Sequence, residues 1–163
     1  MMKNINLNDE VKVKDSDKSI IKGIFTLKNS NGKIIFSKEN MILKSGRELI
    51  KETIFQSNTI SPLNFKLYLS TDQAEPNPDY TGTGADIREF SLTADDFTYD
   101  SANISVTITK TISSDDTTGT FYSAGLKYED ILFSRVTFPS TSITQPINED
   151  SPATYQITYT IYF

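Results

Sequence analysis

The chain lacks cysteine, histidine and tryptophan altogether. Without cysteine there is no disulfide framework, no thiol nucleophile and no thiolate metal site. Without histidine the commonest general base and the commonest transition-metal ligand are missing. No stretch approaches the roughly 18 apolar residues of a membrane span, and residues 1–10 contain no continuous apolar run, so we expect no secretory signal and no membrane partner. These absences predict a soluble protein made inside a cell, with no cofactor, no metal and no catalytic residues.

Charge is unevenly distributed along the 163 residues, whose net charge is −5. Residues 1–52 hold 11 Lys/Arg against 7 Asp/Glu, whereas residues 53–163 hold 5 against 14. The acidic majority argues against a nucleic-acid partner, which requires a basic face. Two interpretations of the basic N-terminal part stay open. It docks on the acidic body of another copy, or its lysines form solvated faces and protected strand edges.

Apolar residues alternate with polar ones through most of the chain. A period of two is typical of a β-strand with one apolar face. It predicts strands over residues 20–28, 33–38, 65–70, 88–92, 103–112, 120–126, 131–138 and 155–163. The turn at residues 29–32 ends in Asn-Gly, which favours a β-hairpin. We therefore expect a mostly β protein, an antiparallel β-sandwich or flattened barrel of about seven or eight strands.

One short α-helix interrupts this pattern. Ser45 and Glu48 have the spacing of a capping box, and Leu49, Ile50 and Ile54 form an apolar stripe. The sequence predicts a helix over residues 46–56. Residues 71–86 and 139–152 carry proline or glycine without periodicity and are expected to be long loops, which in compact domains are functional or mobile. The predicted organisation is a polar N-terminal arm, residues 1–18, and a single β domain, residues 19–163, containing the helix.

Paired acidic residues are the main candidates for chemistry. Carboxylate pairs can hydrolyse glycosides or hold Ca²⁺. None has the ligand spacing of a calcium loop, and each falls in a predicted turn, where Asp suits the backbone. We interpret them as solvated turns and assign no catalytic, cofactor-binding or metal-binding residue, which predicts a protein that is not an enzyme. The acidic residues concerned are Asp95, Asp96, Asp100, Asp115, Asp116, Glu129, Asp130, Glu149 and Asp150.

Arg135 is the one charged residue on an apolar-looking strand face. The alternation of residues 131–138 places it on the face of Ile131 and Phe133. Two interpretations stay open. The arginine lies at a subunit contact or pairs with a buried carboxylate, or it simply marks the solvent-facing side of an antiparallel strand.

The order of the segments from residue 40 to residue 163 resembles that of small virion proteins of tailed bacteriophages, found in the tail, baseplate or fibre-attachment region. The segments are an extended stretch leading into a short helix at residues 41–50, the strand at 64–70, a Pro/Gly loop, the corner Ala124-Gly-Leu126, and strands at 132–139 and 155–163. The chain departs from that family in three places. Ser70-Thr-Asp72 replaces Gly-Thr-Gly, Tyr122-Ser-Ala124 lacks an acidic residue, and Tyr159 stands where a tryptophan is common.

The resemblance implies a non-enzymatic structural protein of the virion, assembled in the host cytoplasm. Its expected partners are other virion proteins and further copies of itself in the tail, neck or baseplate, where repeated weak contacts add up. The arm or the loop at residues 71–86 would reach a neighbour. A capsid decoration or head-fibre protein is one alternative. Another is a module binding host surface glycans, with Tyr80, Tyr99, Tyr122 and Tyr128 in or near loops.

Overall fold

The computed structural model describes residues 21–57, 59–82, 87–115, 117–143 and 153–163. The predicted N-terminal arm therefore lies outside the described residues. Nine strands occur in the described part: β1 (Lys22–Asn29), β2 (Ile34–Ile42), β3 (Phe65–Ser70), β4 (Ile87–Ser91), β5 (Phe97–Asp100), β6 (Ser105–Ser113), β7 (Gly119–Tyr128), β8 (Ile131–Ile143) and β9 (Thr154–Tyr162). The helical elements are α1 (Lys44–Phe55) and the short 3₁₀ turns η1 (Pro62–Asn64) and η2 (Ala94–Asp96).

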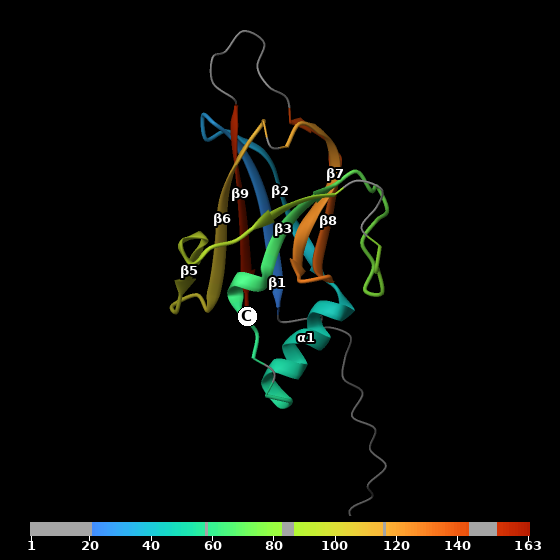
Figure 1. The fold of residues 1–163 in the computed structure, drawn as a ribbon, viewed down its shortest axis with the longest axis vertical. Coiled ribbons are helices and arrows are strands. Elements are labelled where there is room, and N and C mark those ends of the chain that lie inside the picture. The colour runs from blue at the N-terminus through green and yellow to red at the C-terminus, as the bar shows by residue number, and fades with distance from the viewer. Residues whose placement is uncertain (1–20, 58, 83–86, 116, 144–152) are drawn as a thin grey trace, which may run out of the picture.

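All nine strands join one antiparallel sheet in the order β4-β3-β7-β8-β2-β1-β9-β6-β5. The sheet curls into a half-barrel, so that residues from both halves fill a single core (Figure 1). Leu67 and Leu126 reach this core from one half, and Phe25, Ile108 and Tyr159 from the other. The predicted mostly β fold with one short helix is confirmed. The additional strand is β5, which follows Asp95-Asp96 directly and is too short for its alternation to be recognised.

The β1–β2 hairpin forms as the Asn-Gly signal predicts. Gly32 has a φ of 77°, a left-handed conformation that glycine adopts without strain. The Asn29 side chain accepts hydrogen bonds from the amides of Asn31 and Lys33. β1 runs antiparallel to β9, with Asn29 paired to Tyr155 and Lys22 paired to Tyr162. The turn of the hairpin therefore lies at the end of the sheet opposite to Phe163.

α1 covers the other end of the sheet, where the chain reaches Phe163 (Figure 1). Its Gly46 approaches β8 so closely that a Cβ there would lie 2.3 Å from the carbonyl oxygen of Phe133. Leu49 is buried and Ile50 packs on the core, but Ile54 is 65% exposed. The predicted stripe is thus wrong at Ile54, because the last turn of the helix extends past the sheet.

The predicted capping box of α1 does not form. The N-cap position is Leu43, which makes no side-chain cap. The Ser45 hydroxyl donates to the carbonyl of Leu132 in β8, and Glu48 accepts from Lys51. The hydrogen bond of Ser45 to the sheet thus replaces the predicted cap of the helix. A capping box does form at η2, where the Asp96 carboxylate accepts from the Thr93 amide at 2.7 Å.

Strand boundaries also differ from the sequence prediction. β2, expected to end at residue 38, continues to Ile42. β8 continues to Ile143, into the stretch expected to be a loop, because Gly119 and Phe121 of β7 pair with Ile143 and Thr141. A bulge before Thr141 accommodates Pro139 within the strand. Ile104, expected to alternate into β6, precedes that strand with a φ of 48° and is 63% exposed. The remainder of the second loop, residues 144–152, lies outside the described residues.

Candidate functional site

A β-bulge in β8 reverses the face on which Arg135 lies. Lys127 of β7 pairs with Leu132 and the next residue, Leu126, pairs with Ser134, so Phe133 is an extra residue in β8. Such an insertion shifts the following side chains to the other face. Phe133 packs in the inner core, whereas Leu132 belongs to a separate cluster on the outer face. The prediction that Arg135 shares a face with Ile131 and Phe133 is therefore wrong, and Arg135 lies on the outer face.

Arg135 is nevertheless fully buried, because the loop after β3 covers it. Its Nη2 lies 3.2 Å from Asp72 Oδ2 and donates to the carbonyls of Asp72 (3.1 Å) and Ala74 (2.9 Å). Nε also donates to Ala74, at 3.2 Å. The ring of Tyr80 lies 4.3 Å from the guanidinium carbon, a cation–π contact. Arg135 does pair with a carboxylate, as one interpretation proposed, but the Asp72 side chain is half-buried (20% exposed) rather than buried. The interpretation of Arg135 as a solvent-facing side chain is wrong.

Asp72 is ionised in this environment. Burial alone raises the pKa of its carboxyl, but the hydroxyl of Tyr80, the amide of Ala74 and the charge of Arg135 outweigh it and hold the pKa below its ordinary value. Tyr80 donates its hydroxyl proton to Asp72 Oδ2. Burial, and then this hydrogen bond, raise the pKa of Tyr80. The Nη1 group of Arg135 has no acceptor among the described residues, so the ring of Tyr80 provides part of the compensation for the buried charge.

Three further hydrogen bonds fix the described part of the loop, residues 71–82, against the sheet. Ser123 Oγ donates to the carbonyl of Asp72 at 2.7 Å. Thr137 Oγ1 donates to Glu75 Oε2 at 2.8 Å. The amide of Lys44, at the start of α1, donates to the carbonyl of Pro78 at 2.8 Å. This loop is therefore an ordered cover that connects the outer face of the sheet to α1.

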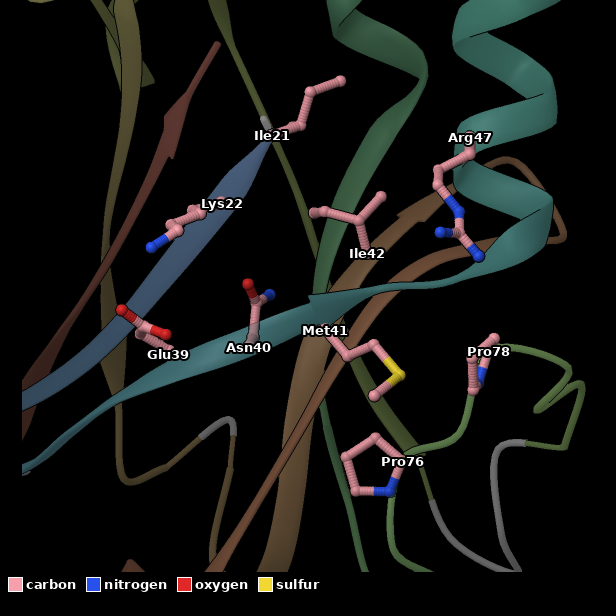
Figure 2. A pocket seen from close by; sticks show the side chains of 9 residues that line it. All are labelled: Ile21, Lys22, Glu39, Asn40, Met41, Ile42, Arg47, Pro76 and Pro78. Carbon is pink, nitrogen blue, oxygen red and sulfur yellow. The ribbon is translucent and has the colours of Figure 1, made fainter. Parts of the chain in front are cut away.

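The anchored loop forms one wall of a groove of about 640 Å³. Figure 2 shows Lys22 and Glu39 on one side, and Arg47 of α1 with Pro76 and Pro78 on the other. The residues between them are mainly apolar. The groove crosses β2 close to its junction with β8, where the two halves of the sheet share only two residue pairs. The full lining is Ile21, Lys22, Glu39, Asn40, Met41, Ile42, Arg47, Pro76 and Pro78.

Asn40 is the buried polar residue of this groove. Its Nδ2 donates to the hydroxyl of Tyr159 at 2.7 Å. Its Oδ1 has no hydrogen-bond partner in the part of the chain that the structure describes. Gly23 makes room for this arrangement, since a Cβ at that position would lie 1.9 Å from Asn40 Oδ1. The groove combines cations, one carboxylate, one amide and apolar surface, a lining that suits a polypeptide segment.

The acidic residues between β4 and β6 mostly stabilise local structure. Asp96 caps η2 and pairs with Lys110 at 3.0 Å. Burial is the largest single influence on the pKa of Asp96 and raises it, but the hydrogen bonds from Thr93 and Lys110 together outweigh burial and lower the pKa. Asp100 accepts from the amides of Ala102 and Asn103. Asp116, Glu149 and Asp150 lie outside the described residues. Within the described ranges, no three His, Cys, Asp or Glu residues group as metal ligands.

The four tyrosines considered for sugar stacking lie in different environments. Tyr80 packs on Arg135, and Tyr128 is buried against Phe65 in the core. Tyr122 is half-buried, and Tyr99 is 66% exposed. Two of the four rings are thus already in contact within the protein. None of the described helices is long and apolar enough to cross a membrane.

The sequence did not predict that Asp72 and Tyr80 are the partners of Arg135. They lie in a stretch without periodicity, and nothing in their spacing indicates that both meet Arg135. The only signal was the isolated arginine, which required a partner if its strand face was covered. Comparisons of the chain with protein-family models, with curated proteins and with solved structures find no match.

Proposed function

We propose that this chain is a non-enzymatic structural subunit of a tailed-phage virion, an oligomeric component of the tail, neck or baseplate that holds neighbouring subunits together. The observation that carries the proposal is the groove beside the anchored loop. A subunit that is held between neighbours needs preformed surfaces, since ordering a surface on binding costs affinity. The groove is such a surface, because its wall is fixed by the buried contacts of Arg135.

The chemistry of the groove supports a protein partner. Met41, Pro76 and Pro78 provide apolar contact area, and Arg47 and Lys22 provide charges at the margins. An apolar centre with a polar rim is the usual anatomy of a protein interface. The order of segments shared with small virion proteins supports the same class of function from the sequence.

The proposal is tested by following the chain in purified phage particles. We expect density-gradient-purified virions to contain the chain in fixed proportion to the major capsid protein, as measured by quantitative mass spectrometry. Met41→Arg places a charge in the groove and should remove the chain from particles. The control Glu39→Gln, at the rim, should leave incorporation unchanged. Both variants must retain the wild-type circular dichroism spectrum. A chain found only in the soluble fraction of the infected cell contradicts the proposal.

A further inference from the structure

Most of the exposed large apolar side chains gather at the end of the sheet covered by α1. We name six of them the apolar end surface: Ile54, Phe55, Leu63, Tyr99, Ile104 and Phe163. They come from α1, η1, β5, the residue before β6 and the residue after β9. Figure 1 shows these elements at the same end of the molecule, around the C-terminus.

Two neighbouring recesses join Tyr99, Ile104 and Phe163 of this surface. A cavity of about 240 Å³ opens between α1, η1 and β5, and Ile50, Tyr99 and Phe163 contribute to its lining. A shallower recess is lined by Tyr99, Phe163 and Ile104. The two share Tyr99, Val106 and Phe163. Thr53 and Pro62 also line the cavity. Ile54 and Phe55 are the next two residues after Thr53 in the chain, and Leu63 is the next residue after Pro62.

The area of this surface matches what a stable interface requires. A large aromatic side chain buries about 150–250 Å², and each of the six residues is about half exposed or more. Together they present roughly 550–950 Å², a range that includes the approximately 800 Å² that one partner contributes to an interface of standard size. The largest apolar patch of a typical monomer is smaller, about 300–600 Å².

The cavity identifies the kind of group that would fill it. Every residue of its lining is apolar or aromatic except Thr53, so a charged or strongly polar group would lose its hydration without compensation. Its volume of about 240 Å³ is below the roughly 300–1,000 Å³ of small-molecule sites. One large apolar side chain from a partner matches both its size and its chemistry.

The chain itself carries such a side chain at the same end of the molecule, on the last turn of α1. Phe55 is 79% exposed, the highest value among the large apolar residues that the structure describes. Because the cavity and Phe55 lie on the same end of the molecule, a two-fold axis can place each Phe55 in the cavity of the other copy. In such an isologous contact both copies use the same patch. We propose that two copies of this chain associate through the apolar end surface, with Phe55 of each inserted into the cavity of its partner.

The first test is the oligomeric state of the full chain by sedimentation velocity. We expect a dimer over about 1–100 µM, and at least a tenfold weaker dimer for Phe55→Ala, because buried aromatic anchors dominate interface energies. The matched control is Ile34→Ala, which removes an apolar side chain, 54% exposed, from the opposite end of the sheet. A wild-type chain that stays monomeric at about 100 µM overturns the proposal. Binding of an apolar probe such as 8-anilinonaphthalene-1-sulfonate to that monomer would not rescue it.

The second test uses the absence of cysteine from the chain. Phe55→Cys and Tyr99→Cys, made as two separate proteins and mixed under mild oxidation, should form a disulfide between different copies. Ile34→Cys mixed with Tyr99→Cys should not. Each position is exposed, so the substitutions leave the core intact. A dimer that forms without the 55–99 cross-link, or that Ile34→Ala weakens as much as Phe55→Ala, shows that another surface is used and overturns the proposal.

Discussion

The two faces of β8 are buried in different ways. On the inner face, Phe133, Val136 and Phe138 join an apolar core. On the outer face, Arg135 and Thr137 are similarly inaccessible, but they lie under a loop rather than under another sheet layer. Apolar burial needs only suitable shape, whereas buried polar groups need individual partners. The outer face therefore depends on a few specific contacts, and single substitutions there should have effects as large as those in the core.

The largest effect is expected for Arg135→Ala. It removes the donor that holds the carbonyls of Asp72 and Ala74 and leaves the Asp72 carboxylate without its cation. Breaking a buried ion pair by removing one partner costs roughly 3–5 kcal/mol, which urea denaturation would measure. Arg47→Ala, the same change at an exposed site, should shift stability by no more than about 0.5 kcal/mol. Equal stability of the two variants would show that the loop is not held by Arg135.

Asp72→Asn should cost less, about 1.5–3 kcal/mol at neutral pH, the range for hydrogen bonds to a charged group. It should also change the response to acid. Because the pKa of Asp72 is lower in the folded protein, its contribution is complete above the unfolded pKa, near 4. That contribution is lost as the pH falls through the folded pKa.

The measurement is the difference in unfolding free energy between neutral pH and about pH 3. It should be smaller in Asp72→Asn than in the wild type. Asp79→Asn provides the control, since Asp79 belongs to the same loop but its side chain is 76% exposed. If Asp79→Asn and Asp72→Asn reduce the acid sensitivity equally, the carboxylate under the loop has no special role.

Gly125→Ala tests the close packing on the outer face. A Cβ at Gly125 would lie 2.0 Å from the carbonyl oxygen of Ser134 and 2.9 Å from the ring of Tyr68. Tyr68 is fully buried and donates to that same carbonyl at 3.1 Å. Overpacking of this kind costs about 1–3 kcal/mol. At Gly82 the nearest atom to an added Cβ would be 3.7 Å away, so Gly82→Ala should be close to neutral. Thermal unfolding of both variants measures the difference.

The inner face could be predicted from the sequence and the outer face could not. Ile108 and Ile157 follow a period of two, so their burial is encoded by neighbouring residues. The Asn-Gly hairpin is similarly local. The bulge at Phe133 depends instead on how β7 pairs with β8 across the sheet. Alternation counted along β8 alone therefore assigned Arg135 to the wrong face.

The partners of Arg135 were unpredictable for the same reason. Asp72 and Tyr80 lie 63 and 55 positions away in the chain, in a loop whose path is decided by the surface that it covers. The predicted capping box of α1 does not form because the Ser45 hydroxyl donates instead to the carbonyl of Leu132, in β8. Local patterns determined the strands and the helix, whereas long-range contacts determined the candidate site.

The smallest effect is expected at the margin of the outer face. Lys66 lies 2.9 Å from Glu89, but the two side chains are 39% and 29% exposed. Solvent screens such a pair, so Lys66→Ala should lower stability only slightly, and the loss should be smaller still in about 1 M salt. Lys127, which contacts the same carboxylate, is only 11% exposed. Lys127→Ala should therefore cost more and respond less to salt in the same urea titrations, and equal effects would show that burial does not set the strength of these contacts.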